Sequence, residues 1–225
     1  MMRKGDVKRQ QLLNESERLF CRYGYDKTSV QDILDAAGLS KGGFYHHFTS
    51  KEEVLTELCD RRAQRAAAFA AERVKTAESP VGRINAVLYG FMPLRRDEDE
   101  FVGLLLPVIA KPEGRAIAMT YQDALEAQFL PLLQAEVEAA AAKQAVFPMV
   151  KDIERVVLNI VNHCWMAIAA QLNDSLLTSG RIDQMVLVTT LEKYRRAVEV
   201  LLDAPYGTIE ILRVEELAEV INAIC

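Results

Sequence analysis

The sequence predicts an all-α protein of about ten helices, with a three-helix helix-turn-helix domain in residues 1–50 and a larger helical domain in residues 51–225. Apolar residues recur at helical spacing along almost the whole chain, and no convincing stretch alternates with a period of two. Gly38 interrupts one helical run between Ile33 and Phe44. A positive φ between two helices is most readily supplied by glycine. These observations favour helices joined by short turns.

The first fifty residues divide into three helices. Thr28 or Ser29 is suited to cap the second helix and Ser40 the third, because a side-chain oxygen there accepts from free backbone N–H groups. Gly24 ends the first helix, whose inward stripe is Leu12, Ser16, Leu19, Phe20 and Tyr23. Two short helices around a glycine turn are typical of a helix-turn-helix, and the pattern predicts one over residues 28–51.

Serines, prolines and glycines delimit the helices that follow. Ser50, with Glu53 at the capping-box position, begins a helix that runs to about residue 78 and links the two domains. Ser79 and Pro80 open the next helix, which reaches about residue 92. Later breaks predict a helix after residue 93, a long helix over about 113–143 with a kink at Pro131, helices over about 148–177 and 181–203, and a terminal helix after residue 207.

Composition excludes several classes of protein. Half of the residues are apolar and 26% are charged, which is typical of a globular protein. No run approaches the roughly 18 apolar residues of a membrane span, and the start has no apolar segment of a signal peptide. The four cysteines lack the spacing of a metal site. We therefore expect a cytoplasmic protein that has no membrane partner and binds neither a metal nor another cofactor.

Charge is distributed unevenly along the chain, whose net charge is −5. Residues 1–65 hold 12 lysines and arginines against 10 acidic residues, whereas the rest of the chain holds 15 against 22. A mildly basic N-terminal segment on an acidic body fits a small nucleic-acid-reading module carried by a larger domain.

The helix that begins near Ser40 carries the strongest functional signal. Phe44 and Phe48 lie four residues apart, so they share the inward face and leave their neighbours outside. Gly42 and Gly43 cost a helix about 1–2 kcal/mol together relative to alanine, which indicates a close approach of the backbone to a ligand or to a packed neighbour. The predicted DNA contacts are Thr28, Ser29, Gln31, Ser40, Lys41, Gly42, Gly43, Tyr45, His46, His47 and Lys51.

The polar residues of this set have complementary roles. Lys41 is expected to bind guanine acceptors or a phosphate, whereas Tyr45 and His46 are expected to donate to phosphates or touch base edges. Lys51, in the first turn of its helix, is expected to hold a phosphate. The alternative interpretations are a solvated charge for the lysines and a half-buried core aromatic for Tyr45. Adjacent histidines point about 100° apart on a helix, which argues against a metal site.

These residues resemble the DNA-binding domain of TetR-family transcriptional regulators over roughly residues 9–58. The motif is carried by Phe20, Tyr23, Gly24, Thr28, Ser29, Ile33, Ala36, Gly38, Leu39, Ser40, Lys41, Gly42, Phe44, Tyr45, His46, His47, Phe48 and Lys51. The resemblance implies an all-α homodimer with a variable C-terminal domain for ligand binding and dimerisation. It also implies that the matching positions contact DNA.

The C-terminal domain offers two weaker sets of candidates. The candidates for surrounding a ligand are aromatic, apolar and polar residues: Phe91, Phe101, Leu105, Met119, Tyr121, Phe129, Asn159, His163, Trp165 and Met166. Ordinary core packing is the alternative interpretation for each. Residues in seams of helix-bundle spacing, expected at a dimer interface, are Ile153, Val157, Ile160, Cys164, Leu187, Leu191, Tyr194, Val198 and Leu201. The core of a monomer is the alternative for these.

Together these features predict a sequence-specific DNA-binding transcriptional regulator that is not an enzyme. No nucleophile elbow, zinc-protease, P-loop or dinucleotide motif is present. The expected partners are double-stranded DNA with a palindromic operator, a second copy of the chain and a small, mostly apolar effector that releases a repressor. The alternative is an effector-independent activator or architectural DNA-binding protein.

Overall fold

The computed structural model describes residues 4–93, 115–178 and 183–216, which form α-helices without a strand. The helices of these ranges are α1 (Lys4–Tyr23), α2 (Val30–Ala37), α3 (Lys41–Tyr45), α4 (Lys51–Thr76), α5 (Pro80–Phe91), α7 (Arg115–Ala142), α8 (Glu154–Thr178) and α9 (Gln184–Leu202). The expected all-α fold is confirmed. None of the helices in the described ranges is long and apolar enough to cross a bilayer.

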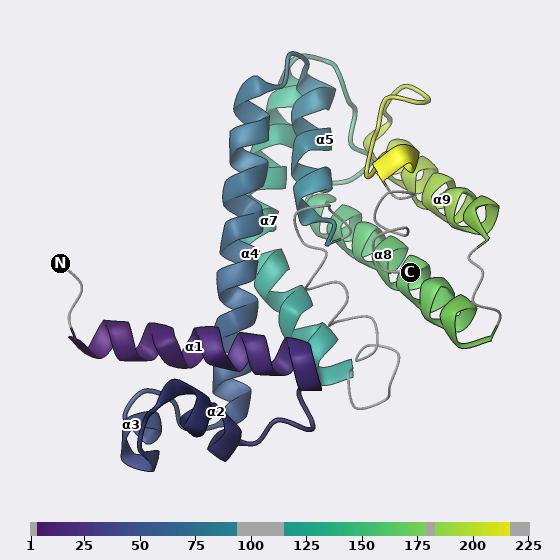
Figure 1. Ribbon diagram of the computed structural model, residues 1–225. Helices are drawn as coiled ribbons and strands as arrows, with labels where there is room; N and C mark the ends of the chain where they lie inside the picture. Colours follow the sequence, from purple (N-terminus) through teal and green to yellow (C-terminus); the bar gives the residue numbers. More distant parts are fainter. Residues whose placement is uncertain (1–3, 94–114, 179–182, 217–225) are drawn as a thin grey trace.

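The long helix α4 joins the two parts of the molecule (Figure 1). Near its N-terminal end α4 is crossed by α1, and α2 and α3 lie on the far side of α1. Along the rest of its length α4 packs against α5 and α7, with α8 and α9 beside that group. Any displacement of α4 in the larger domain is therefore carried directly to the three N-terminal helices.

Four serines cap the helices at the predicted positions. Each serine side chain accepts a hydrogen bond from the backbone N–H three residues later, which satisfies a donor that the helix leaves free. These caps are Ser29 on α2, Ser40 on α3, Ser50 on α4 and Ser79 on α5. In α5 the first helical residue is Pro80, as expected.

Two separate clusters of buried side chains form the cores. The N-terminal cluster joins α1, α2 and α3 to the start of α4 and ends with Val54 and Leu58. The larger cluster begins at Cys59 and continues along α4 into the remaining helices. The first two turns of α4 therefore complete the N-terminal core, so that core extends beyond the boundary at residue 50.

A tight crossing fixes α5 on α4. A Cβ atom added at Gly90 would lie 2.5 Å from Cβ of Ala70, so the two helices touch through residues without bulk. Phe129 of α7 lies at the same point, 3.4 Å from that position, and its ring meets Phe91 edge to face. α4, α5 and α7 are therefore packed together as one unit.

One predicted helix start is wrong, because Pro148 does not open a helix. α8 begins at Glu154, and the preceding segment is held against the end of α9 instead. The backbone N–H groups of Phe147 and Met149 donate to the carbonyls of Leu202 and Leu201, at 2.8 and 3.2 Å.

Pro131 lies inside α7 as expected. The helix expected after residue 93 lies outside the described residues, and the expected terminal helix is described only over residues 214–216.

Candidate nucleic-acid interface

The turn between α2 and α3 has the predicted glycine geometry. Gly38 has φ 63° and ψ 34°, in the left-handed region, and its N–H closes the end of α2 on the carbonyls of Leu34 and Asp35. The next N–H, of Leu39, donates to Leu34 at 3.0 Å. This is the paired hydrogen bonding that ends a helix and reverses the chain.

Two phenylalanines determine which edge of α3 faces solvent. Phe44 and Phe48 are 0% and 1% exposed, and their ring centroids lie 6.0 Å apart. Lys41, Gly42 and His46 are consequently exposed, and the Tyr45 side chain retains 51% of its surface. The expected outward face of this segment is therefore present, with His47 half-buried at its flank.

The glycines of α3 have no packing role within the described part of the chain. A Cβ atom at Gly42 would meet no atom within 4 Å, and one at Gly43 would make only ordinary contacts, at 3.6 and 3.8 Å. Neither residue has a positive φ. Packing against the described part of the chain therefore does not explain the paired glycines.

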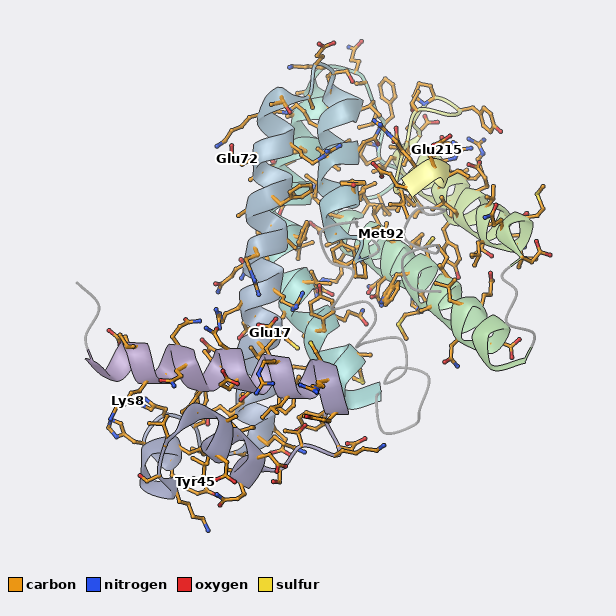
Figure 2. All side chains as sticks on the ribbon, in the orientation of Figure 1. Lys8, Glu17, Tyr45, Glu72, Met92 and Glu215 are labelled. Carbon is orange, nitrogen blue, oxygen red and sulfur yellow. The ribbon has the colours of Figure 1, made fainter. Side chains whose placement is uncertain are left out.

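The start of α1 contributes a cationic group that sequence reasoning missed. The pKa of His47 is lowered first by partial burial and then by the electrostatic effect of His46, Arg9 and Lys8. Figure 2 shows Lys8 and Tyr45 at the same end of the molecule. The basic residues at positions 8 and 9 were visible in the sequence, but their place beside α3 depends on how α1 crosses the domain.

At the start of α2, Ser29 and Gln31 are exposed as expected but already hydrogen-bonded within the helix. The Ser29 hydroxyl oxygen accepts from the Asp32 N–H at 3.1 Å, and the Asp32 carboxylate accepts from the Ser29 N–H at 2.8 Å, which together form a capping box. The Ser29 hydroxyl also donates to that carboxylate, at 2.7 Å. The Gln31 amide donates to Asp35 at 2.7 Å. The Ser29 hydrogen bonds hold the pKa of Asp32 below its usual value. The Ser29 hydroxyl has a single proton and must leave the carboxylate before it can donate to a phosphate, whereas the Gln31 amide has a second N–H for that role.

Thr28 does not lie on the predicted surface. Its side chain is 2% exposed, and its hydroxyl donates to the Gly24 carbonyl at 2.8 Å. It holds the connection between α1 and α2 in place, so we leave it out of the proposed contact surface.

Lys51 is also occupied inside the domain, contrary to the role expected for it. Its Nζ donates to the carbonyls of Tyr25 and Thr28, at 2.8 and 3.0 Å, and lies 4.1 Å from the Tyr25 ring centre. Burial and the nearby Glu52 raise the pKa of Tyr25. Lys51 therefore fastens the α1–α2 connection to the first turn of α4.

The expected ligand residues separate into core, surface and undescribed positions. Phe91, Tyr121, Phe129 and Trp165 are buried in the larger core, and Met166 packs against it. Asn159 accepts a hydrogen bond from Gln122 at 3.1 Å. His163 is exposed, with its Nδ1 2.7 Å from the Asn159 carbonyl oxygen, and Met119 is 57% exposed, so neither side chain lies in the buried core. Phe101 and Leu105 lie outside the described residues.

Most of the expected dimer residues are buried inside a single chain. Six of them are at most 2% exposed, and these are Ile153, Val157, Cys164, Leu187, Leu191 and Val198. Ile160, Tyr194 and Leu201 are partly buried against the same core. The six fully buried residues hold α8 and α9 to their own domain, which favours the monomer-core interpretation for them. Ile160, Tyr194 and Leu201 keep some exposed surface, and their expected place at a dimer interface stays a prediction.

The segment with this geometry has known relatives. Residues 12–58 match the family described as bacterial regulatory proteins, tetR family. The HTH-type transcriptional repressor Rv1474c of Mycobacterium tuberculosis is 38% identical over 64 residues, which are 28% of this chain and 34% of the relative. The HTH-type transcriptional repressor KstR2 of Rhodococcus jostii is 45% identical over 51 residues, 23% of this chain and 25% of the relative. The matches thus span about a third or less of these two relatives.

Solved structures extend the likeness in fold to nearly the whole chain. A TetR transcription regulator from Haloarcula marismortui has a TM-score of 0.59 at 17% identity, covering 88% of this chain and 97% of that one. GusR of Salmonella enterica has a TM-score of 0.54 at 17% identity, covering 90% and 99%. The resemblance found in the sequence is confirmed, and the larger domain has the fold of these proteins.

Proposed function

We propose that this chain, which carries the DNA-binding domain of the tetR family of bacterial regulatory proteins, is a sequence-specific transcriptional repressor. A small, mostly apolar ligand releases it from a palindromic operator. The observation that carries the DNA-binding part is the exposed edge of α3, where a Cβ atom at Gly42 would meet nothing within 4 Å and one at Gly43 would make only ordinary contacts. The names of the relatives as transcriptional repressors support the regulatory role and agree with the absence of an enzymatic one.

In this proposal α3 lies in the major groove, and its exposed residues have different roles in binding the duplex. Gly42 and Gly43 let the backbone approach the duplex, and Lys41, Tyr45 and His46 reach base edges or phosphates. Ser40, Ser29 and Gln31 flank the groove, and His47 lies with Lys8 and Arg9 beside the phosphate backbone. Lys8 replaces Lys51 as the phosphate-binding lysine, because the Lys51 ammonium is hydrogen-bonded to two carbonyls.

A palindromic operator requires two copies of α3 related by a twofold axis. The buried seams of α8 and α9 are unavailable, so we propose that the exposed faces of these helices form the dimer. Val156 of α8 is 44% exposed, and Val186 and Val200 of α9 are 46% and 49% exposed. Replacing Val156 and Val200 by aspartate is expected to yield monomers in sedimentation experiments and to abolish preference for a palindrome. A dimer of unchanged stability would place the interface elsewhere.

Release by a ligand is supported by the position of α4 and by the aromatic residues of the larger core. Phe91 and Phe129 pack edge to face, with centroids 5.4 Å apart, where α5 meets α7. Both helices contact α4. An apolar ligand that inserted beside these rings would displace α4 and move α3 with it.

Selection of bound sequences from random DNA, with and without a metabolite extract, tests the whole proposal. We expect one palindromic sequence to be enriched and its binding to fall when the extract is present. Lys41→Ala serves as the matched variant, because Lys41 is exposed and its replacement is expected to leave the fold intact. Enrichment that the extract leaves unchanged favours the effector-independent DNA-binding protein. Failure to enrich any sequence refutes the DNA-reading role.

A further inference from the structure

A polar cleft lies at the end of α4 that is remote from α3. The cleft has a volume of about 310 Å³ and is lined by the last turn of α4, by α5 and by the segment after α9. Figure 2 labels Glu72 on α4 and Glu215 after α9, which are close in sequence to lining residues and lie at this end. Among the described residues none from α7 or α8 lines the cleft, so it is separate from the contact of Phe91 with Phe129.

Two aromatic rings hold the Arg73 side chain of α4 in place. Its Cζ lies 4.5 Å from the centre of the Tyr89 ring and 5.7 Å from that of the Phe69 ring, and the two ring centres are 6.1 Å apart. Attraction between a cation and aromatic faces orders the side chain without neutralising its charge. Arg73 is exposed and forms no ion pair with the residues that the structure describes, so its N–H groups are available in the cleft.

Asn85 of α5 fastens the segment after α9 to the cleft. Its amide donates to the Thr208 carbonyl at 2.8 Å, and its side-chain oxygen accepts from the backbone N–H of Glu210 at 3.0 Å. Ile209, between these two residues, is 1% exposed. The segment is therefore anchored on α5 by hydrogen bonds and by burial, and this anchoring brings Arg213 to the edge of the cleft.

Arg213 supplies a second guanidinium group. Its Nε donates to Glu210 at 2.7 Å, and the pKa of Arg213 is raised first by this hydrogen bond and then by the charges of Glu210 and Glu216. Its two terminal nitrogens donate to no group within the described ranges. Two arginines and one glutamate line the cleft, which leaves one positive charge in excess. That excess suits a monoanion better than a dianion.

We propose that this cleft binds a small carboxylic acid as its anion. The planar guanidinium of Arg73 matches the two oxygens of a carboxylate, and the terminal nitrogens of Arg213 donate from the other side. The apolar part of the acid lies against Ala77 and Ala86, which line the same cleft. This site goes beyond the proposed function, because it shares no residue with the DNA-binding surface or with the aromatic contact in the larger core.

Binding of benzoate to the full chain, measured by calorimetry, tests the proposal. Benzamide is the uncharged probe of the same shape, and inorganic sulfate is the dianion. We expect benzoate to bind at least tenfold more tightly than either. Arg73→Gln should weaken benzoate binding about tenfold, as expected for the loss of a charge-assisted hydrogen bond. Arg73→Lys keeps the charge but not the planar donors, so it should recover only part of the affinity. Arg213→Gln should have a smaller effect, because Nε of Arg213 already binds Glu210.

Lys75→Gln is the matched control. Lys75 is a cation of the same last turn of α4, but it pairs with Glu72 at 2.6 Å and does not line the cleft, so benzoate binding should stay unchanged. Both arginines are exposed, so their variants are expected to fold, which thermal denaturation checks. If Arg73→Gln does not fold, Arg213→Gln still decides the matter.

Three results would overturn the inference. These are a wild-type protein that does not bind benzoate, equal affinity for benzoate and benzamide, and benzoate binding that neither arginine variant weakens. Because no DNA enters the measurement, the proposed function stands or falls separately.

Discussion

At Gly42 the residue that best suits folding differs from the one that best suits DNA binding. A Cβ atom there meets nothing within 4 Å, and the backbone is helical. Alanine should therefore stabilise the domain by about 0.5–1 kcal/mol through its helix propensity. The same methyl group would stand between α3 and the duplex, and we expect operator affinity to fall about tenfold, equivalent to 1.4 kcal/mol. Urea denaturation and operator titration measure the two effects, and a loss of stability would show that Gly42 is structural.

Lys41 and Lys51 illustrate how one residue type can have opposite roles within one motif. Lys51→Ala removes two hydrogen bonds to carbonyl groups, and we expect the free energy of unfolding to fall by roughly 2 kcal/mol. Exposed Lys41→Ala should leave stability within about 0.5 kcal/mol and weaken DNA binding. Thermal denaturation of both variants, with operator titration at several salt concentrations, measures the difference. Normal stability of Lys51→Ala combined with lost affinity would restore its role as a phosphate ligand.

How well the position of a single residue could be predicted depended on how far away in the sequence its contacts lie. Gly38 and the phenylalanines of α3 were predictable, because a turn and a helix face depend on neighbours a few residues away. The carbonyl partners of Lys51 were not predictable, since Tyr25 and Thr28 lie more than twenty residues earlier in the chain. Lys8 was missed for the same reason, because its neighbour His47 lies 39 residues later in the sequence.

At the scale of elements, the contact between α4 and α5 reverses the usual effect of replacing a helical glycine. Gly90 and Gly42 are both helical, but a Cβ atom at Gly90 would lie 2.5 Å from Cβ of Ala70 and 3.2 Å from its Cα. We expect Gly90→Ala to cost about 1–3 kcal/mol, because the helices must separate to admit the methyl group. Denaturation of the two alanine variants in parallel compares them directly. Equal and favourable changes would contradict the close crossing.

Helix starts were predictable wherever a serine could cap the chain locally, but Pro148 was misleading. The residues on either side of Pro148, Phe147 and Met149, instead lie against the end of α9, more than fifty residues later in the chain. The apolar seams of α8 and α9 were likewise only partly predictable. Heptad-like spacing correctly indicated that one face of each helix is buried, but spacing does not say whether the covering surface belongs to the same chain.

For the molecule as a whole, the proposed DNA-binding end, with α3, is spatially separate from the acidic larger domain. α3 and Lys8 lie at one end, whereas Glu72 is near the far end of α4 and Glu215 lies close to α9 (Figure 2). A net charge of −5 would oppose DNA binding if it were spread evenly. Because the acidic residues lie far from α3, their repulsion of the DNA phosphates acts mainly on the larger domain. This charge distribution favours an orientation in which α3 approaches the duplex first.

The same charge distribution predicts tighter DNA binding at lower pH. In the free protein the pKa of His47 is lowered by partial burial and by His46, Arg9 and Lys8, with Asp6 acting in the opposite direction. A phosphate beside this group would favour the protonated ring and raise the pKa of His47, so binding takes up a proton. Affinity should therefore increase as pH falls from 8 to 6, by at most about tenfold per pH unit for one proton. Operator titrations at constant salt measure this slope, and His47→Gln should reduce it. A slope that His47→Gln leaves unchanged would remove His47 from the interface.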